Sequence, residues 1–223
     1  MSVLVASCVR KTDAATVEPA VADSPVLADT FAIQAPLADR IAIYNLGNQL
    51  APDNTGITKF RIEFSRAGKA LKAFNYSIPF QREAGSWMMS NEVFADSLAG
   101  VIDRRFVILT NGFEACGYPQ YSLMFFADGK IELIDRWISF SDGGMGDWRE
   151  FFPIFSGGLV TEFRSRRVSA EPVDGPAGTT LVEITYRDST HVQQAGQKWV
   201  PNVITVPDVR YRTEVLTENE YYQ

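Results

Sequence analysis

The chain has 223 residues, which suits one large domain, and 46% of them are hydrophobic, enough to build a core. Its formal net charge of −6 argues against a nucleic-acid partner, because a protein that holds phosphates needs a basic face. Two cysteines and one histidine exclude a disulfide framework and disfavour a zinc site. We therefore expect no cofactor and no metal.

The first thirty residues differ in composition from the rest of the chain. All aromatic residues and all glycines come after residue 30, where Phe31 and Gly47 are the first of each kind. Residues 9–30 are rich in Ala, Val, Thr, Asp and Pro and show no regular periodicity, as is typical of a tether. We predict a flexible leader over residues 1–30 and a single β-rich globular domain over residues 31–223.

Within the leader, an aliphatic residue and two small ones precede Cys8, in the order Val5, Ala6, Ser7. This segment resembles the lipobox of bacterial lipoprotein signals, although the basic and apolar regions before it are short or missing. The resemblance implies a lipid on Cys8, membrane attachment, and a location on the periplasmic side of the bacterial cell envelope. The alternative is an ordinary terminus with a chance cysteine, in which case we expect a cytoplasmic protein.

The domain itself shows mostly period-two patterning. Phe60, Ile62 and Phe64 alternate with charged residues, which predicts a half-buried strand. A turn at residues 67–69 leads into a second alternating run that ends at Phe80. These two runs are predicted to form a hairpin.

A second hairpin is predicted from Tyr121–Ala127 and Lys130–Phe140, which are separated by an Asp-Gly pair. The latter run has apolar residues on both faces, so we place it at the centre of a sheet that is covered on both sides. Further strands are expected at residues 105–110, 159–169, 179–187, 200–206 and 208–217.

Helical periodicity is found in one segment, from Ser90 to Arg104, where Phe94, Leu98 and Val101 fall on one face. A weaker helix is expected over residues 36–46. Together with eight to ten strands, these elements indicate a mainly β or α+β fold. We expect an antiparallel sheet, arranged as a sandwich or barrel, with one or two helices packed on it.

The segment from Ser141 to Trp148 combines three glycines, two carboxylates and a tryptophan. Loops on rigid sheets commonly bind ligands, so Asp142, Asp147, Trp148 and Glu150 are candidate ligand-binding or partner-binding residues. Carboxylates on such a loop can also bind calcium, but the spacing is not that of an EF-hand. The simplest alternative is a long turn whose glycines meet backbone requirements.

Cys116, His191 and Asn202 follow the order of the nucleophile, base and orienting amide in a cysteine hydrolase. A strand-like run follows Cys116, whereas such thiols are activated at the start of a helix. We therefore assign no catalytic residue.

Two pairs of arginines share strand faces, Arg164 with Arg166 and Arg210 with Arg212. They would form an anion site if their strands were neighbours. The alternative is pairing with cross-strand acids such as Glu183 and Glu214.

The leader, the acidity and the absence of catalytic motifs favour a non-enzymatic bacterial envelope lipoprotein that binds another protein, as an inhibitor or immunity-type module. A first alternative is a carrier whose β-domain encloses an apolar ligand or a glycan. A second alternative is a carboxylate-dependent envelope hydrolase that acts through Asp142, Asp147 and Glu150, which requires carboxylates that converge in a cleft.

Lipidation of Cys8 can be tested by intact mass measurement and membrane fractionation of protein expressed from its native locus. We expect a mature chain that begins at Cys8, bears acyl groups and sediments with membranes. An unmodified chain that retains Met1 in the soluble fraction would contradict the lipobox interpretation.

Overall fold

The computed structural model of the chain describes residues 25–35, 37–50, 56–79, 85–96, 99–112, 118–127, 130–142, 145–196, 198–204 and 210–221. These residues form antiparallel sheets and one short α-helix, α1 (Glu218–Tyr221). The predicted mainly β, sandwich-like fold is therefore confirmed. Residues 1–24, with Cys8 and most of the predicted leader, lie outside the described residues, and the first strand begins at Val26.

Sheet A is built from the N-terminal strands in chain order. Its strands are β1 (Val26–Ala32), β2 (Arg40–Leu50), β3 (Gly56–Arg66) and β4 (Lys69–Pro79). The first predicted hairpin is β3–β4, and Phe60, Ile62 and Phe64 are buried as their alternation predicts. The turn residues Ala67 and Gly68 have φ of 47° and 76°, the positive values that match the twist of a two-residue hairpin.

Sheet B has the strand order β10, β9, β8, β5. The bounds are β5 (Ser86–Ser90), β8 (Phe106–Gly112), β9 (Gln120–Ala127) and β10 (Lys130–Ile138). The second predicted hairpin is β9–β10. We expected its second strand, β10, at the centre of the sheet, but β10 is an edge strand. That strand is apolar on both faces because sheet B lies between two cores, with Ile131 and Leu133 in the core toward sheet A and Ile134 and Trp137 against the core toward sheet C.

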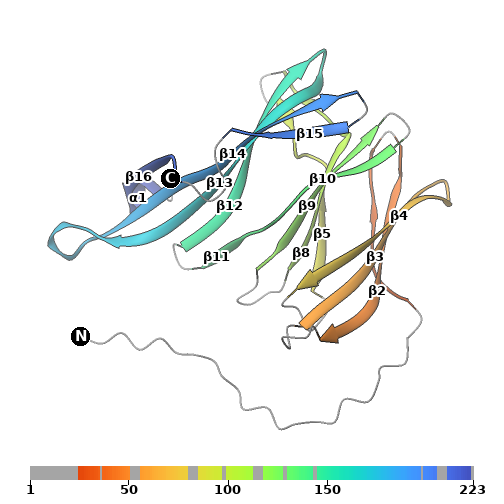
Figure 1. The fold of residues 1–223 in the computed structure, drawn as a ribbon, viewed down its shortest axis with the longest axis horizontal. Coiled ribbons are helices and arrows are strands. Elements are labelled where there is room, and N and C mark those ends of the chain that lie inside the picture. The colour runs from red at the N-terminus through yellow and green to blue at the C-terminus, as the bar shows by residue number, and fades with distance from the viewer. Residues whose placement is uncertain are drawn as a thin grey trace, which may run out of the picture.

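Sheet C contains the longest strands. They are β11 (Phe140–Asp142), β12 (Met145–Ser156), β13 (Leu159–Asp174), β14 (Thr180–Ala195), β15 (Lys198–Val203) and β16 (Arg212–Thr217). The first four strands are paired in chain order, and β15 and β16 pair with opposite halves of β14. The β13–β14 hairpin extends well beyond the other sheets (Figure 1).

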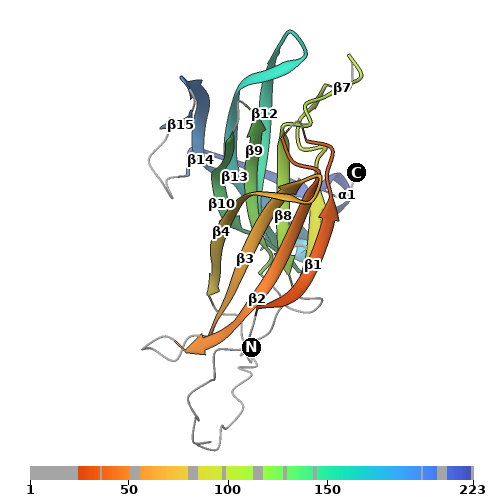
Figure 2. The same cartoon turned by 90° about the vertical axis from the view of Figure 1, so that its right-hand side faces the viewer.

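The three sheets form three layers with sheet B in the middle (Figures 1 and 2). Alternate residues of β9 serve the two cores: Met124 and Phe126 pack toward sheet A, and Leu123 and Phe125 pack toward sheet C. A strand buried on both faces is read in the sequence as a continuous apolar run rather than an alternating one. This arrangement explains the continuous apolar run Leu123–Ala127 in β9.

Both predicted helices are absent from the described residues. In place of the helix at 90–104 is a small hairpin of β6 (Ala95–Asp96) and β7 (Val101–Ile102). The carboxylate of Asp96 accepts a hydrogen bond from the Ala99 N–H at 3.1 Å, and Gly100 has a φ of 63°, which ends any helix there. Phe94 is buried, as the helical stripe requires, but it packs 4.6 Å from the Phe106 ring as part of this turn.

The helix expected over residues 36–46 is instead the start of β2. Ile41 and Ile43 are fully buried against sheet B, so tertiary packing of the strand outweighs the weak helical periodicity.

A buried carboxylate links sheet B to sheet C through hydrogen bonds. Asp103, which is 1% exposed, precedes β8 and accepts a hydrogen bond from the Val160 N–H of β13 at 2.8 Å. It also accepts hydrogen bonds from the Arg105 guanidinium, from Nε at 2.9 Å and from Nη2 at 2.6 Å. The same Nη2 donates to the Val160 carbonyl at 2.9 Å. Removal of this carboxylate would leave the Val160 N–H without its acceptor and the Arg105 guanidinium without its counter-charge.

We predict that Asp103→Ala lowers the free energy of unfolding by about 3–5 kcal/mol, the usual effect of breaking a buried ion pair. Urea denaturation followed by circular dichroism measures this loss. Asp174→Ala, which removes an exposed carboxylate at the end of β13, is the matched control. Equal denaturation midpoints for the two variants would contradict the role of Asp103.

Candidate ligand-binding cleft

Sheets B and C pack closely around Phe106 and Phe163, but they enclose a cleft of about 500 Å³ farther along. Residues of β8 to β12 line it, together with Tyr221 of α1. A second hollow of about 350 Å³ adjoins it, sharing Trp137, Asp147 and other residues. These volumes are within the range of small-molecule sites.

Six aromatic residues line the cleft. They are Tyr121, Trp137, Phe140, Trp148, Phe151 and Tyr221. The rings of Tyr121 and Trp137 stack with centroids 5.2 Å apart and an interplanar angle of 5°, and Phe151 meets Trp137 edge-on at 5.4 Å. All six are only partly buried, unlike the phenylalanines of the neighbouring core. Part of each of these rings is therefore accessible from the cleft.

The face of sheet C that looks toward sheet B changes from apolar to charged along β12 and β13. Phe151 and Phe163 belong to the core, and the next residues on the same face are Asp147, Arg149 and Arg167. Charged groups cannot be buried against an apolar sheet without a large desolvation cost. This change in residue type explains why the two sheets do not close over the cleft.

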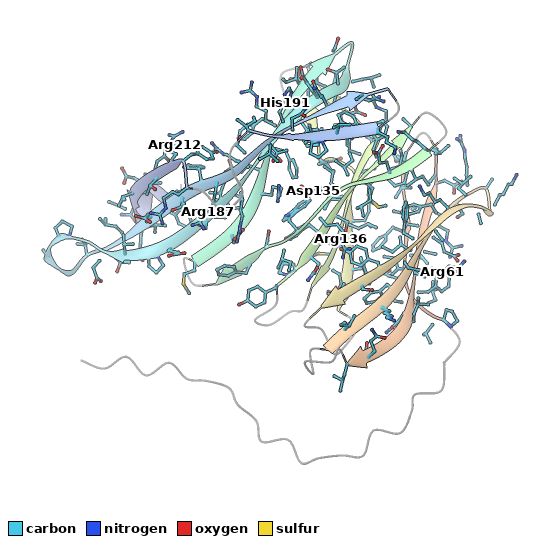
Figure 3. The ribbon with its side chains drawn as sticks, viewed as in Figure 1. Arg61, Asp135, Arg136, Arg187, His191 and Arg212 are labelled. Carbon is cyan, nitrogen blue, oxygen red and sulfur yellow. The ribbon has the colours of Figure 1, made fainter. Side chains whose placement is uncertain are left out.

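One ion pair crosses from sheet B to sheet C at this point. A bulge in β10 lies between Leu133 and Asp135, and the Asp135 carboxylate is 3.3 Å from Nη1 of Arg149 on β12. The Arg149 guanidinium also lies 5.7 Å from the centroid of the Trp137 ring. Figure 3 shows Asp135 in the space between β10 and sheet C.

Burial raises the pKa of Asp135, while the charge of Arg149 and the Arg136 backbone N–H, which donates at 2.8 Å, act in the opposite direction. Because the folded-state pKa is the higher one, the stability that Asp135 contributes is complete below its unfolded pKa. That stability is lost as the pH rises through the folded pKa. Burial also raises the pKa of Tyr121, so its phenol remains a hydrogen-bond donor at neutral pH.

Two of the four candidate binding residues, Asp147 and Trp148, line the cleft. The expected glycine-rich loop is instead the β11–β12 hairpin, in which Phe140 pairs with Asp147. Asp147 is buried and accepts hydrogen bonds from Nη2 and Nε of Arg167 at 2.6 and 2.8 Å. Trp148 is half-buried and packs against the cluster that contains Val168.

The other two candidates have different positions. Glu150 accepts hydrogen bonds from Nε of Arg166 at 2.6 Å and from the Trp148 indole at 3.3 Å. Strand alternation places it on the opposite face of β12 from Asp147, so these two carboxylates do not converge. The backbone of Asp142 ends β11, and its side chain lies outside the described part of the chain.

The residues of the imagined cysteine hydrolase are only partly described. His191 and Asn202 are directly opposite each other on β14 and β15, while Cys116 lies outside the described residues. Nε2 of His191 is 2.6 Å from the Glu162 carboxylate, which occupies the nitrogen that a nucleophile would need.

Both arginines near β16 are paired with carboxylates. Arg210, just before β16, forms an ion pair with Glu183 of β14 at 3.3 Å, as the cross-strand alternative predicts, whereas Arg212 pairs with Glu214 of its own strand. Their guanidiniums are therefore engaged with carboxylates rather than arranged around an anion.

Asp135, Arg149 and Arg167 were not identified from the sequence. The available signal was the alternation Asp147, Arg149, Phe151, a strand face that begins charged and becomes apolar. That pattern indicates where β12 leaves the core, but it does not predict which strands lie opposite β12 across the cleft.

Among the described residues, no group of three or more His, Cys, Asp or Glu side chains is arranged to hold a metal ion. In that same part of the chain, no helix is long and apolar enough to cross a bilayer. Comparisons with protein-family models, with curated proteins and with solved structures gave no match. Function is therefore inferred from the chemistry of the cleft.

We predict that Arg149→Met raises the pKa of Asp135 further, because the nearby positive charge that opposes the effect of burial is removed. The titration of the side-chain carboxyl carbon, followed by NMR, measures this pKa. Arg61→Met removes a guanidinium 2.7 Å from Glu63 on sheet A and is the control, expected to leave Asp135 unchanged. An unaltered pKa in Arg149→Met would show that the two side chains are not paired.

Proposed function

We propose that the domain is a non-enzymatic binding protein and that the cleft between sheets B and C holds a small, partly apolar ligand. The observation that supports this most directly is the set of six half-exposed aromatic side chains around one cavity. Tyrosine and tryptophan offer a large contact area with few rotatable bonds, together with a polar group that orients a ligand. This proposal corresponds to the ligand or glycan carrier considered from the sequence.

The polar groups of the cleft support binding rather than hydrolysis. Of the described residues that line the cleft, Asp147 provides the one carboxylate, and Arg167 holds it. Glycoside hydrolysis requires two carboxylates on either side of a bond. Asp147, Arg149 and the Tyr121 phenol instead form a small set of polar groups in an aromatic site, which is the usual composition of a specificity-determining pocket.

A protein-binding role, the first expectation from the sequence, is a second proposal, and a different surface supports it. The face of sheet C turned away from sheet B exposes Phe152 and Ile154 by 44% and 42%, next to the exposed Arg164. Adjacent exposed apolar side chains of this kind are typical of contact surfaces. A lipid on Cys8 at the periplasmic side of the cell envelope would present both this face and the cleft to the surroundings.

We predict that the neutral fluorescent dye N-phenylnaphthylamine binds to the full chain and that Trp137→Ala weakens binding by about tenfold, because a stacked ring is lost from the cleft. Fluorescence titration measures the affinity. Phe152→Ala, which removes an aromatic ring from the opposite face of sheet C, is the matched control. Binding that is equally strong in Trp137→Ala and the wild type would exclude the cleft as the site.

A further inference from the structure

Three arginines lie in a row across the face of sheet C that borders the cleft. Arg149 of β12 is directly opposite Arg167 of β13, which is directly opposite Arg187 of β14. We call these three residues the arginine row. Side chains directly opposite one another on neighbouring strands are in close contact, and like charges in such positions are destabilising. The row therefore requires an explanation beyond packing.

The register of β13 and β14 creates the row. The pairing of these strands shifts by one residue between Ser165 and Arg167. Bulges re-aim side chains and are frequent next to binding sites. Here the shift brings Arg187 directly opposite Arg167.

The protein satisfies the hydrogen-bonding capacity of the row only in part. Arg149 pairs with Asp135, and Arg167 pairs with Asp147, but Arg187 donates from Nη2 to the Ser169 hydroxyl at 3.4 Å. The Nε atoms of Arg149 and Arg187 are buried and have no hydrogen-bond partner in the described structure. Buried N–H groups are nearly always satisfied, and those that are not indicate a missing ligand or water.

The row begins at the aromatic cleft. Arg149 lines the cleft beside Trp137, and both Arg149 and Arg167 line the adjoining hollow. Arg187 lies on β14 of sheet C, to the left of Asp135 in Figure 3, and does not line either hollow. The aromatic surface of the cleft is thus next to Arg149 and Arg167, and Arg187 extends the row across sheet C.

On the basis of the binding role proposed above, we propose that the ligand is an amphipathic organic anion. Its carboxylate, sulfate or phosphate group is bound by the arginine row, and its ring-containing body lies against Tyr121, Trp137 and Phe151. Guanidiniums bind oxyanions through two parallel hydrogen bonds, which provides geometric specificity as well as charge. The anion would supply acceptors for Arg149 and Arg187, whose Nε atoms have no hydrogen-bond partner in the described structure.

Two dyes with the same ring system test this proposal. Anilinonaphthalene sulfonate is N-phenylnaphthylamine with an added sulfonate, so the ratio of their affinities isolates the anionic group. We expect the sulfonated dye to bind the full chain about tenfold more tightly, as charge-assisted hydrogen bonds provide. We also expect this preference to decline with rising salt concentration.

Arg187→Gln is expected to reduce the affinity for the sulfonated dye about tenfold and to leave the neutral dye unaffected. Arg149 lines the cleft itself, so Arg149→Gln is expected to weaken the sulfonated dye by a larger factor than the neutral dye. Arg61→Gln removes one positive charge from sheet A and is the control (Figure 3). Displacement of the dye by phenyl phosphate, phenyl sulfate and benzoate then ranks the three head groups.

Thermal unfolding separates a binding role from a structural one. Because Arg187→Gln relieves repulsion within the row, we expect its melting temperature in the absence of ligand to equal or exceed that of the wild type. A structural arginine would show a lower melting temperature and no selective loss of the sulfonated dye.

Two failures are distinguishable. If both dyes bind equally, or if the arginine variants behave as Arg61→Gln does, the anionic ligand is excluded while the cleft remains a binding site. If neither dye responds to Trp137→Ala, the cleft itself is excluded.

Discussion

The relative placement of sheets B and C depends on the buried carboxylate of Asp103. It is held between the Arg105 guanidinium beside β8 and the backbone of β13, so it fixes both sheets at one point. Phe94, Phe106 and Phe163 fill the space around this point without a gap to solvent. This end of the sandwich is dry and closed. The cleft lies at the other end, where the Asp135–Arg149 ion pair crosses between the two sheets.

Arg149 and Arg167 line the open end of the sandwich. Burial of charged side chains against an apolar sheet carries a desolvation cost, which opposes closure there. The row is itself unfavourable, because it places like charges on neighbouring strands and leaves the Nε atoms of Arg149 and Arg187 without a partner in the described structure. Binding sites commonly lower the stability of a fold in this way, since the groups that await a ligand cannot also satisfy each other.

Local patterns predicted the parts of the fold that are local. The β3–β4 and β9–β10 hairpins follow from alternation and turn residues, and Asp147 and Trp148 were found because their segment has an unusual composition. The prediction of a helix at 90–104 was wrong, because a buried Phe94 is compatible both with a helix that has one apolar face and with the observed hairpin. The arginine row could not be predicted, since it depends on a one-residue shift between β13 and β14 that no local pattern encodes.

The four tryptophans provide the most direct test that the cleft is a binding site. Trp137 and Trp148 line the cleft, whereas Trp87 and Trp199 are buried in the cores on either side of sheet B. Titration with anilinonaphthalene sulfonate, followed through the four indole N–H signals by NMR, distinguishes the two pairs. The account predicts that the signals of Trp137 and Trp148 shift while those of Trp87 and Trp199 stay in place. Unchanged signals from Trp137 and Trp148 at a saturating dye concentration would contradict it.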